Sequence, residues 1–261
     1  MYKIPGAKTI LVMGDSRTGY GINDSLLDNA YNLSSEADAP IFSYEKLRKV
    51  LPLNPNIRTV VLSVSEQNIQ QGMINFDNTS FINKKIRDYF QLMTTHELLY
   101  IFTKNPEQVL KSIIGLPKYT TPICIKILRS KKKDIQTLGI GGYYNLYGFI
   151  DIKRDSVAAS NKEGQFEISQ SQLDYLHKIV ALCKSYNVKI IFIRTPTHKL
   201  FSRKNDATFF NVLNAQFGAV SFKDYSNMDL PDSCYFDLKH LNYYGAQIFT
   251  DSVRQFLKTQ N

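Results

Sequence analysis

The chain has 261 residues, of which 43% are hydrophobic and 21% are charged, so its composition excludes disordered and collagen-like chains and predicts a folded globular protein. The 32 Lys and Arg against 23 Asp and Glu give a formal net charge of +9, which suits an acidic partner without specifying one. Three cysteines without paired spacing exclude a disulfide framework and a cysteine-based zinc site. No apolar run approaches the roughly 20 residues of a transmembrane helix.

The N-terminal part alternates between strand and helix patterns. Residues 9–13 predict a strand, and apolar residues at helical spacing between 22 and 30 predict a helix. A short strand at 31–33 and a helix from Pro40 to Leu51 follow. Residues 59–64 (TVVLSV) predict a strand buried on both faces, as in a parallel sheet.

The alternation stops between about residues 71 and 165. Amphipathic stretches at 86–102 and 106–116 predict two helices there. Since neither edge of this region has a clear linker, we predict an insertion on the α/β core rather than a separate domain.

Alternation then returns as helix, strand, helix, strand and helix, predicted at 173–183, 188–193, 208–217, 219–222 and 243–258. The inward residues predicted for the last helix are Ile248, Phe249, Val253, Phe256 and Leu257. We therefore predict one domain over 1–261. Its predicted fold is a three-layer α/β/α sandwich with a mostly parallel central sheet and a largely helical insertion.

A serine follows the first predicted strand, at the edge of a parallel sheet where ligands bind. Gly14 permits a sharp turn, and a helix starting at Ser16 would place backbone N–H groups near the hydroxyl, where they can stabilise an oxyanion. Ser16 is therefore a candidate nucleophile. The alternative is structural, because turns and helix caps also favour Gly, Asp and Ser.

Asp237 and His240 lie just before the last predicted helix. At this spacing the carboxylate can reach the imidazole within one irregular turn, fix its tautomer and stabilise the imidazolium. The alternative is that Asp237 only caps the segment and His240 lies on the surface.

The two motifs together resemble the SGNH (GDSL-like) hydrolases and acyltransferases, which have GDS after the first strand and DxxH before the last helix. The segment 237–246 is especially similar to members that act on carbohydrate O-acyl groups. The resemblance covers most of the α/β core. It implies that Ser16 is the nucleophile, His240 the general base and Asp237 the acid that orients the histidine.

Two further blocks of that family are altered in this chain. The family's glycine after the second strand is missing, so the backbone N–H of Ser34, Ser35 or Ala37 would have to replace it in the oxyanion hole. Gln67 and Asn68 stand where the family has Gly-x-Asn-Asp, and either side-chain amide can donate a hydrogen bond. A missing oxyanion donor typically costs about 10²–10³ in rate.

No metal or cofactor is expected. His96, His177 and His198 lack metal-ligand spacing, and the glycines of 139–142 lack the strand and helix context of a nucleotide-binding loop. The basic cluster 126–133 favours a solvated face, with contact to an anionic membrane surface as the alternative. We expect no nucleic-acid partner.

The leading hypothesis is an SGNH-type serine esterase or O-acyltransferase that acts on a small-molecule or polysaccharide acyl ester. The alternative is a non-catalytic carbohydrate-binding or scaffold protein with this fold, which the altered oxyanion blocks favour. A third hypothesis has Lys131, Lys132 and Lys133 dock the chain on nucleic acid or anionic lipid.

Met1 is followed too soon by the apolar residues 9–13 for a signal peptide. If the chain is complete, we expect a cytoplasmic protein. If its N-terminus has been trimmed, we expect an extracytoplasmic, membrane-associated one.

Overall fold

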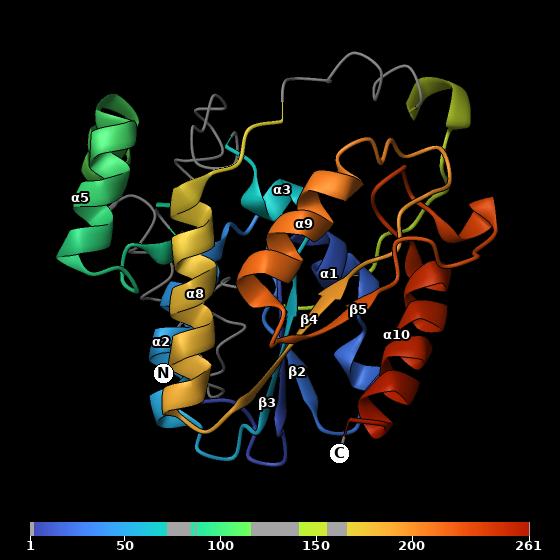
Figure 1. The fold of residues 1–261 in the computed structure, drawn as a ribbon, viewed down its shortest axis with the longest axis horizontal. Helices are drawn as coiled ribbons and strands as arrows, with labels where there is room; N and C mark the ends of the chain where they lie inside the picture. Colours follow the sequence, from blue (N-terminus) through green and yellow to red (C-terminus); the bar gives the residue numbers. More distant parts are fainter. Residues whose placement is uncertain (1–2, 72–84, 87, 116–140, 156–165, 261) are drawn as a thin grey trace.

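The computed structural model describes residues 3–71, 85–86, 88–115, 141–155 and 166–260. In this part of the chain a central sheet lies between two layers of helices (Figure 1). No helix among these residues is long and apolar enough to span a membrane.

The sheet has five parallel strands in the order β2-β1-β3-β4-β5. The strands are β1 Ile10–Met13, β2 Ala30–Asn32, β3 Thr59–Ser63, β4 Lys189–Arg194 and β5 Ser221–Asp224. The strand order changes direction between β1 and β3, since β2 is added on one side of β1 and all later strands on the other. Open α/β sheets bind ligands at such a switch point, beyond the carboxyl ends of the strands.

The helices of the described residues include α1 Ser16–Gly21, α2 Pro40–Val50, α3 Glu66–Ile69, α5 Thr95–Lys104, α8 Gln170–Ser185, α9 Asp206–Phe217 and α10 Tyr243–Lys258. The described residues also include the 3₁₀ turns η1 Asp24–Leu26, η2 Leu51–Leu53 and η4 Asp232–Cys234. A helix at 106–115 follows α5.

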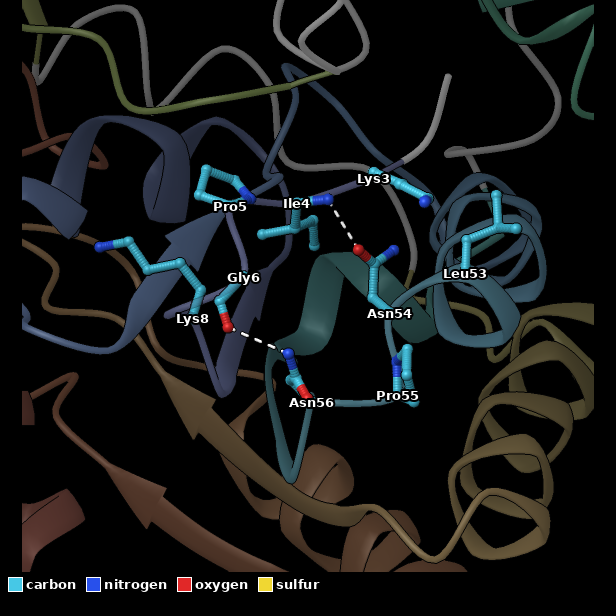
Figure 2. Close-up of a pocket in the computed structure, with 9 residues that line it drawn as sticks. All are labelled: Lys3, Ile4, Pro5, Gly6, Lys8, Leu53, Asn54, Pro55 and Asn56. Atoms are coloured by element: carbon cyan, nitrogen blue, oxygen red, sulfur yellow. Dashed lines mark hydrogen bonds between the residues drawn. The ribbon is translucent and has the colours of Figure 1, made fainter.

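The amino-terminal edge of the sheet has a small pocket of about 170 Å³. It lies between residues 3–8, which precede β1, and residues 53–56, which precede β3 (Figure 2). The side chain of Asn54 accepts a hydrogen bond from the Ile4 N–H at 2.6 Å, which fastens the N-terminal segment to this edge. The pocket is therefore at the edge opposite to the one where ligands of such sheets bind.

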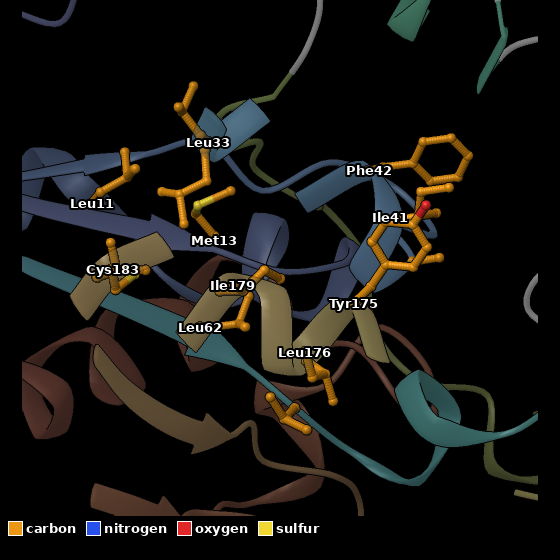
Figure 3. Close-up of a cluster of buried hydrophobic side chains, with 14 of the residues drawn as sticks. Leu11, Met13, Leu33, Ile41, Phe42, Leu62, Tyr175, Leu176, Ile179 and Cys183 are labelled. Carbon is orange, nitrogen blue, oxygen red and sulfur yellow. The ribbon is translucent and has the colours of Figure 1, made fainter. Parts of the chain in front are cut away.

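Side chains on the two faces of the sheet form two separate hydrophobic cores. Leu11 and Met13 belong to one core and Val12 to the other, because successive strand residues point to opposite faces. On the first face α8 contributes Ile179 and Cys183 (Figure 3). The second core contains the inward residues of α10, among them Phe249, Val253 and Leu257. The predicted three-layer α/β/α fold with a parallel sheet is confirmed.

The predicted insertion contributes to the first of these cores. Tyr89, Ile101 and Val109 are buried in the same cluster as the residues of α2 and α8. Much of 71–165 lies outside the described residues, so the single domain with an insertion at these bounds stays a prediction.

Three predictions about helices were wrong. The residues between 22 and 30 form only the turn η1, because the helix after β1 already begins at Ser16 and ends at Gly21. The helix predicted at 86–102 is interrupted, since Thr94 caps a new helix by accepting a hydrogen bond from the Glu97 N–H. Ile248 is exposed and does not face the core.

Candidate active site

Ser16 is the first residue of α1, directly beyond the carboxyl end of β1. Gly14 has a φ of +152°, and a Cβ atom there would lie 2.5 Å from Thr18 Oγ1 and 2.7 Å from Ser63 Cβ. Only glycine fits this turn. The Asp15 side chain then caps α1 by accepting a hydrogen bond from the Arg17 N–H at 3.0 Å.

Ser16, His240 and Asp237 form one continuous chain of hydrogen bonds. Ser16 Oγ lies 2.9 Å from His240 Nε2. On the other side of the ring, His240 Nδ1 lies 2.8 Å from Asp237 Oδ2 and 3.0 Å from Oδ1. With the Nδ1 proton held by the carboxylate, Nε2 carries a free lone pair toward the serine hydroxyl. In this arrangement His240 Nε2 can accept the hydroxyl proton of Ser16.

The loop before α10 orients the Asp237 carboxylate. Its Oδ1 accepts hydrogen bonds from the backbone N–H groups of Lys239, at 2.7 Å, and His240, at 2.9 Å. Partial burial acts to raise the pKa of Asp237, but the His240 ring and these two N–H groups outweigh it and hold the pKa below its usual value. The carboxylate is therefore ionised at neutral pH and can stabilise a protonated histidine.

Asn242 fixes the end of this loop. Its side-chain oxygen caps α10 by accepting hydrogen bonds from the N–H groups of Tyr244 and Gly245. Its Nδ2 donates to the carbonyls of Ser233, at 2.8 Å, and Gly148, at 2.9 Å. The loop that carries the histidine is thus tied to the start of α10 and to the segment around residue 148.

A buried network of charges lies beneath Ser16. Arg17 pairs with Asp15 at 2.8 Å and lies 3.7 Å from Glu66, and Arg194 donates to Glu66 at 3.0 Å. Burial acts to raise the pKa of Asp15, but the adjacent guanidinium lowers it overall. Asp15 and Arg17 follow β1, Glu66 follows β3, and Arg194 is the last residue of β4. The network therefore connects the carboxyl ends of three strands below the site.

Tyr20 is a site residue that the sequence analysis missed. Its ring packs edge-on against His240, with 5.4 Å between ring centroids, and its hydroxyl donates to Glu36. Burial and this acceptor raise the pKa of Tyr20, so its phenol stays protonated. The signal was available, since residues four apart on a helix share a face and Tyr20 follows Ser16 by four on α1.

The residues predicted for the oxyanion hole lie at the same edge of the sheet, but several of their polar groups already have partners. The Ser35 N–H donates to the Gly14 carbonyl at 3.1 Å, and the Ser34 N–H donates to Asn32 Oδ1 at 2.8 Å. A donor role for Ser35 would require its bond to open. The oxyanion role of this segment stays a prediction.

Gln67 and Asn68 lie in α3, which begins just after β3. Asn68 Oδ1 accepts hydrogen bonds from the Ser65 N–H and hydroxyl, both at 2.9 Å. These two bonds fix the orientation of the Asn68 side-chain amide, and its Nδ2 hydrogens remain as donors. Gln67 is half-buried. The proposed donation from either side chain also stays a prediction.

The remaining histidines are not members of this chain of hydrogen bonds. Among the described residues there is no cluster of His, Cys, Asp and Glu that could hold a metal ion. The exposed His177 stacks on Phe217, and His198 is buried beside Asp232. The basic cluster 126–133 and residues 139–140 lie outside the described residues.

The chain was compared with protein families, curated proteins and solved structures. One family model, which has no descriptive name, matches residues 150–260. No curated protein matches the chain.

Two solved structures are similar to the chain at low sequence identity. One is a Streptococcus pneumoniae protein named "putative platelet activating factor", with 13% identity, a TM-score of 0.48 and coverage of 96% of this chain and 84% of that one. The other is a Bacteroides fragilis protein named "putative acylhydrolase", with 12% identity, a TM-score of 0.42 and coverage of 96% and 86%. A likeness at this level carries no argument about function.

Proposed function

We propose that the protein is a serine esterase or O-acyltransferase with Ser16 as nucleophile, His240 as general base and Asp237 as the group that orients the histidine. The observation that carries the proposal is the unbroken chain of hydrogen bonds through these three side chains. Ser16 and His240 are 224 positions apart in the sequence, so local turn chemistry does not account for their contact.

In the first half-reaction, Ser16 Oγ attacks the carbonyl carbon of an ester while His240 Nε2 takes the hydroxyl proton. The tetrahedral intermediate collapses to an acyl-serine, and the alcohol leaves with the proton that His240 returns. The ionised Asp237 stabilises the imidazolium that exists between these two proton transfers.

In the second half-reaction, a water or an acceptor hydroxyl attacks the acyl-serine and gives its proton to His240. His240 then protonates Ser16, which restores the enzyme. Water gives hydrolysis and a sugar hydroxyl gives acyl transfer, so the choice depends on how the site seats the acceptor and excludes water. We propose a carbohydrate acyl ester as substrate, on the resemblance of residues 237–246 to enzymes with such substrates.

A non-catalytic carbohydrate-binding protein is the second candidate. The observation that favours it is that the N–H groups of Ser34 and Ser35 are engaged within the fold. The tetrahedral intermediate that leads to an acyl-serine needs donors for its oxyanion, and the loss of one donor costs about 10²–10³ in rate.

A fluorophosphonate probe tests the proposal, because it forms a stable bond only with an activated serine. The wild type should be labelled, and Ser16→Ala should not. Ser25→Ala is the matched control, since Ser25 lies in an exposed turn of the same connection and should not affect labelling. Labelling that survives in Ser16→Ala contradicts the nucleophile. A folded wild type that is neither labelled nor active on aryl acetates supports the binding protein.

A further inference from the structure

Residues 141–150 form a segment that borders the candidate active site. Four backbone hydrogen bonds of 2.9–3.0 Å hold it to the chain around that site: Gly142 N–H to Ser34, Tyr144 N–H to Gly19, Tyr243 N–H to Leu146 and Ile150 N–H to Tyr235. The segment thus contacts the end of β2, α1, the start of α10 and the loop that carries Asp237. Figure 1 shows it in yellow-green beside the upper end of α10.

This segment and the start of α10 carry an unusual concentration of exposed aromatic rings. Tyr147 is 75% exposed, Phe149 61%, Tyr244 56% and Tyr144 52%. Tyr147 stacks on Tyr243 with 6.0 Å between ring centroids, and Phe149 stacks on Tyr244 at 6.3 Å. We call these five rings the aromatic surface. Mutual packing holds four of these rings in place, all except Tyr144, while large parts of the surface remain open to solvent.

The aromatic surface begins next to the proposed general base. The Tyr144 N–H bonds to the residue before Tyr20, and the Tyr20 ring packs against His240. On the other side, a Cβ atom on Gly148 would lie 3.3 Å from the ring of Phe236, which precedes Asp237. A ligand that lay along this surface would therefore reach the candidate site at one end.

The chemistry of the surface favours an uncharged ligand that has both flat apolar faces and hydroxyl groups. Four of the five residues are tyrosines, which offer an apolar ring face together with a hydroxyl that can donate and accept. The adjoining residues 151–155 carry two acidic and two basic side chains, and Arg154 is paired with Asp155 at 2.9 Å. Among the described residues here, no surplus positive charge favours an anionic lipid or polymer.

We propose that the aromatic surface binds an extended, uncharged glycan chain, whose sugar rings stack on the exposed tyrosine and phenylalanine rings. Large exposed apolar patches on soluble proteins commonly mark binding sites. Two stacked pairs side by side fit several consecutive sugar units better than one. Only the placement of an ester at Ser16 rests on the proposed function, because binding to the surface needs no catalysis.

Affinity gel electrophoresis of Ser16→Ala tests binding without turnover, with hydroxyethyl cellulose, arabinoxylan and galactomannan as probes. We expect at least one of them to retard the protein. Tyr147→Ala and Tyr244→Ala should each weaken that retardation about two- to tenfold, as expected for the loss of a stacking partner. Tyr244→Phe should keep most of the binding, since it keeps the ring.

Tyr186→Ala is the matched control. Tyr186 is 44% exposed and lies at the C-terminal end of α8, near the opposite edge of the sheet, so its loss should not change retardation. Hydrolysis of a small aryl acetate should also be unchanged in Tyr186→Ala, because Tyr186 belongs neither to the aromatic surface nor to the candidate active site.

The inference would be overturned by no retardation with any of the probes, by equal losses in Tyr186→Ala, or by Tyr147-dependent binding to phosphatidylcholine–phosphatidylglycerol vesicles instead of glycans. A change of oligomeric state in Tyr147→Ala would instead assign the surface to a second copy of the chain, and would also overturn it. Retardation without any aryl acetate hydrolysis would leave the glycan site standing and reject the esterase.

Discussion

Two histidines at the carboxyl edge of the sheet each pair with an aspartate. His240 Nδ1 lies 2.8 Å from Asp237, in the loop before α10. His198 lies in the loop after β4, and its Nε2 is 3.1 Å from Asp232, the first residue of η4. Both rings also pack edge-on against a tyrosine, His240 against Tyr20 and His198 against Tyr235.

The regions around the two histidines differ in the hydrogen-bond partner of the second ring nitrogen. His240 Nε2 faces the hydroxyl of Ser16 at 2.9 Å. His198 Nδ1 accepts a hydrogen bond from the N–H of Leu200, two residues along its own loop. His240 is also partly open to solvent, with 21% of its side chain exposed, whereas His198 has 1%. A histidine–aspartate pair is therefore not a catalytic signature by itself, because the group at the second nitrogen decides what the pair can do.

The two regions are also connected. The His198 N–H donates to the carbonyl of Leu238, and the Tyr235 hydroxyl donates to the carbonyl of Thr197. Leu238 lies between Asp237 and His240. The loop after β4 thus supports the loop that carries the proposed catalytic residues. The bond from the His198 N–H joins two backbone groups, so it does not depend on the His198 side chain.

The largest expected effect is the loss of kcat on substitution of His240, the histidine that contacts Ser16. His240→Ala should lower kcat for aryl acetate hydrolysis by about 10⁴–10⁶, since removal of the base from a serine triad costs about this much. The melting temperature measured by circular dichroism should change little, because His240 is only half-buried. Near-wild-type kcat in this variant would show that Ser16 does not depend on His240.

Asp237→Asn should have the next largest effect. The amide keeps the size of the side chain but removes its charge and permits the wrong tautomer of His240, so kcat should fall by about 10²–10⁴ while KM changes little. Asp232→Asn is the matched control at the other pair. It should stay within about twofold of the wild-type kcat, as a surface substitution remote from the chemistry does. Equal losses of kcat in Asp237→Asn and Asp232→Asn would contradict a catalytic role that is specific to the Asp237–His240 pair.

His198→Ala should lower the stability of the protein more than its kcat, the reverse of what we expect for His240→Ala. It removes a buried ring packed on Tyr235 and breaks two hydrogen bonds, so we expect a loss of about 2–3 kcal/mol in the free energy of unfolding in urea. The kcat of the folded fraction should fall much less than in His240→Ala. His177→Ala, at an exposed histidine, should change stability by no more than about 0.5 kcal/mol.

The smallest expected effect is a pH-dependent difference in stability between the wild type and Asp237→Asn. The folded-state pKa of Asp237 is lowered by its hydrogen bonds, so the ionised carboxylate stabilises the fold above its unfolded pKa. This contribution disappears as the pH falls through the folded pKa. The stability difference between wild type and Asp237→Asn should therefore be present at pH 7 and vanish in urea melts below the normal carboxyl range. A difference that is constant with pH would contradict this charge effect.

The sequence predicted the strands to within two residues because buried parallel strands are continuous apolar runs, as in residues 59–64. It misplaced the first helix because Ile22, Leu26 and Ala30 have helical spacing, whereas the structure has a short 3₁₀ turn there and exposes Leu26. Ser16 and His240 were paired on a resemblance, since no local pattern brings them together. The charge network through Arg17 and Arg194 left no sequence signal, because its members meet only through the sheet.

The contact between Ser16 and His240 has a consequence for synthesis. The residues are 224 positions apart, and β3, β4 and β5 are all made between them. Domains form as units while a chain is translated, N-terminal parts first. A nascent chain would therefore carry the serine from the outset and gain its base only after the strands between them are in place. A probe that labels Ser16 should report completed folding: when urea is diluted away, reactivity should appear after the helical circular dichroism signal and not with it.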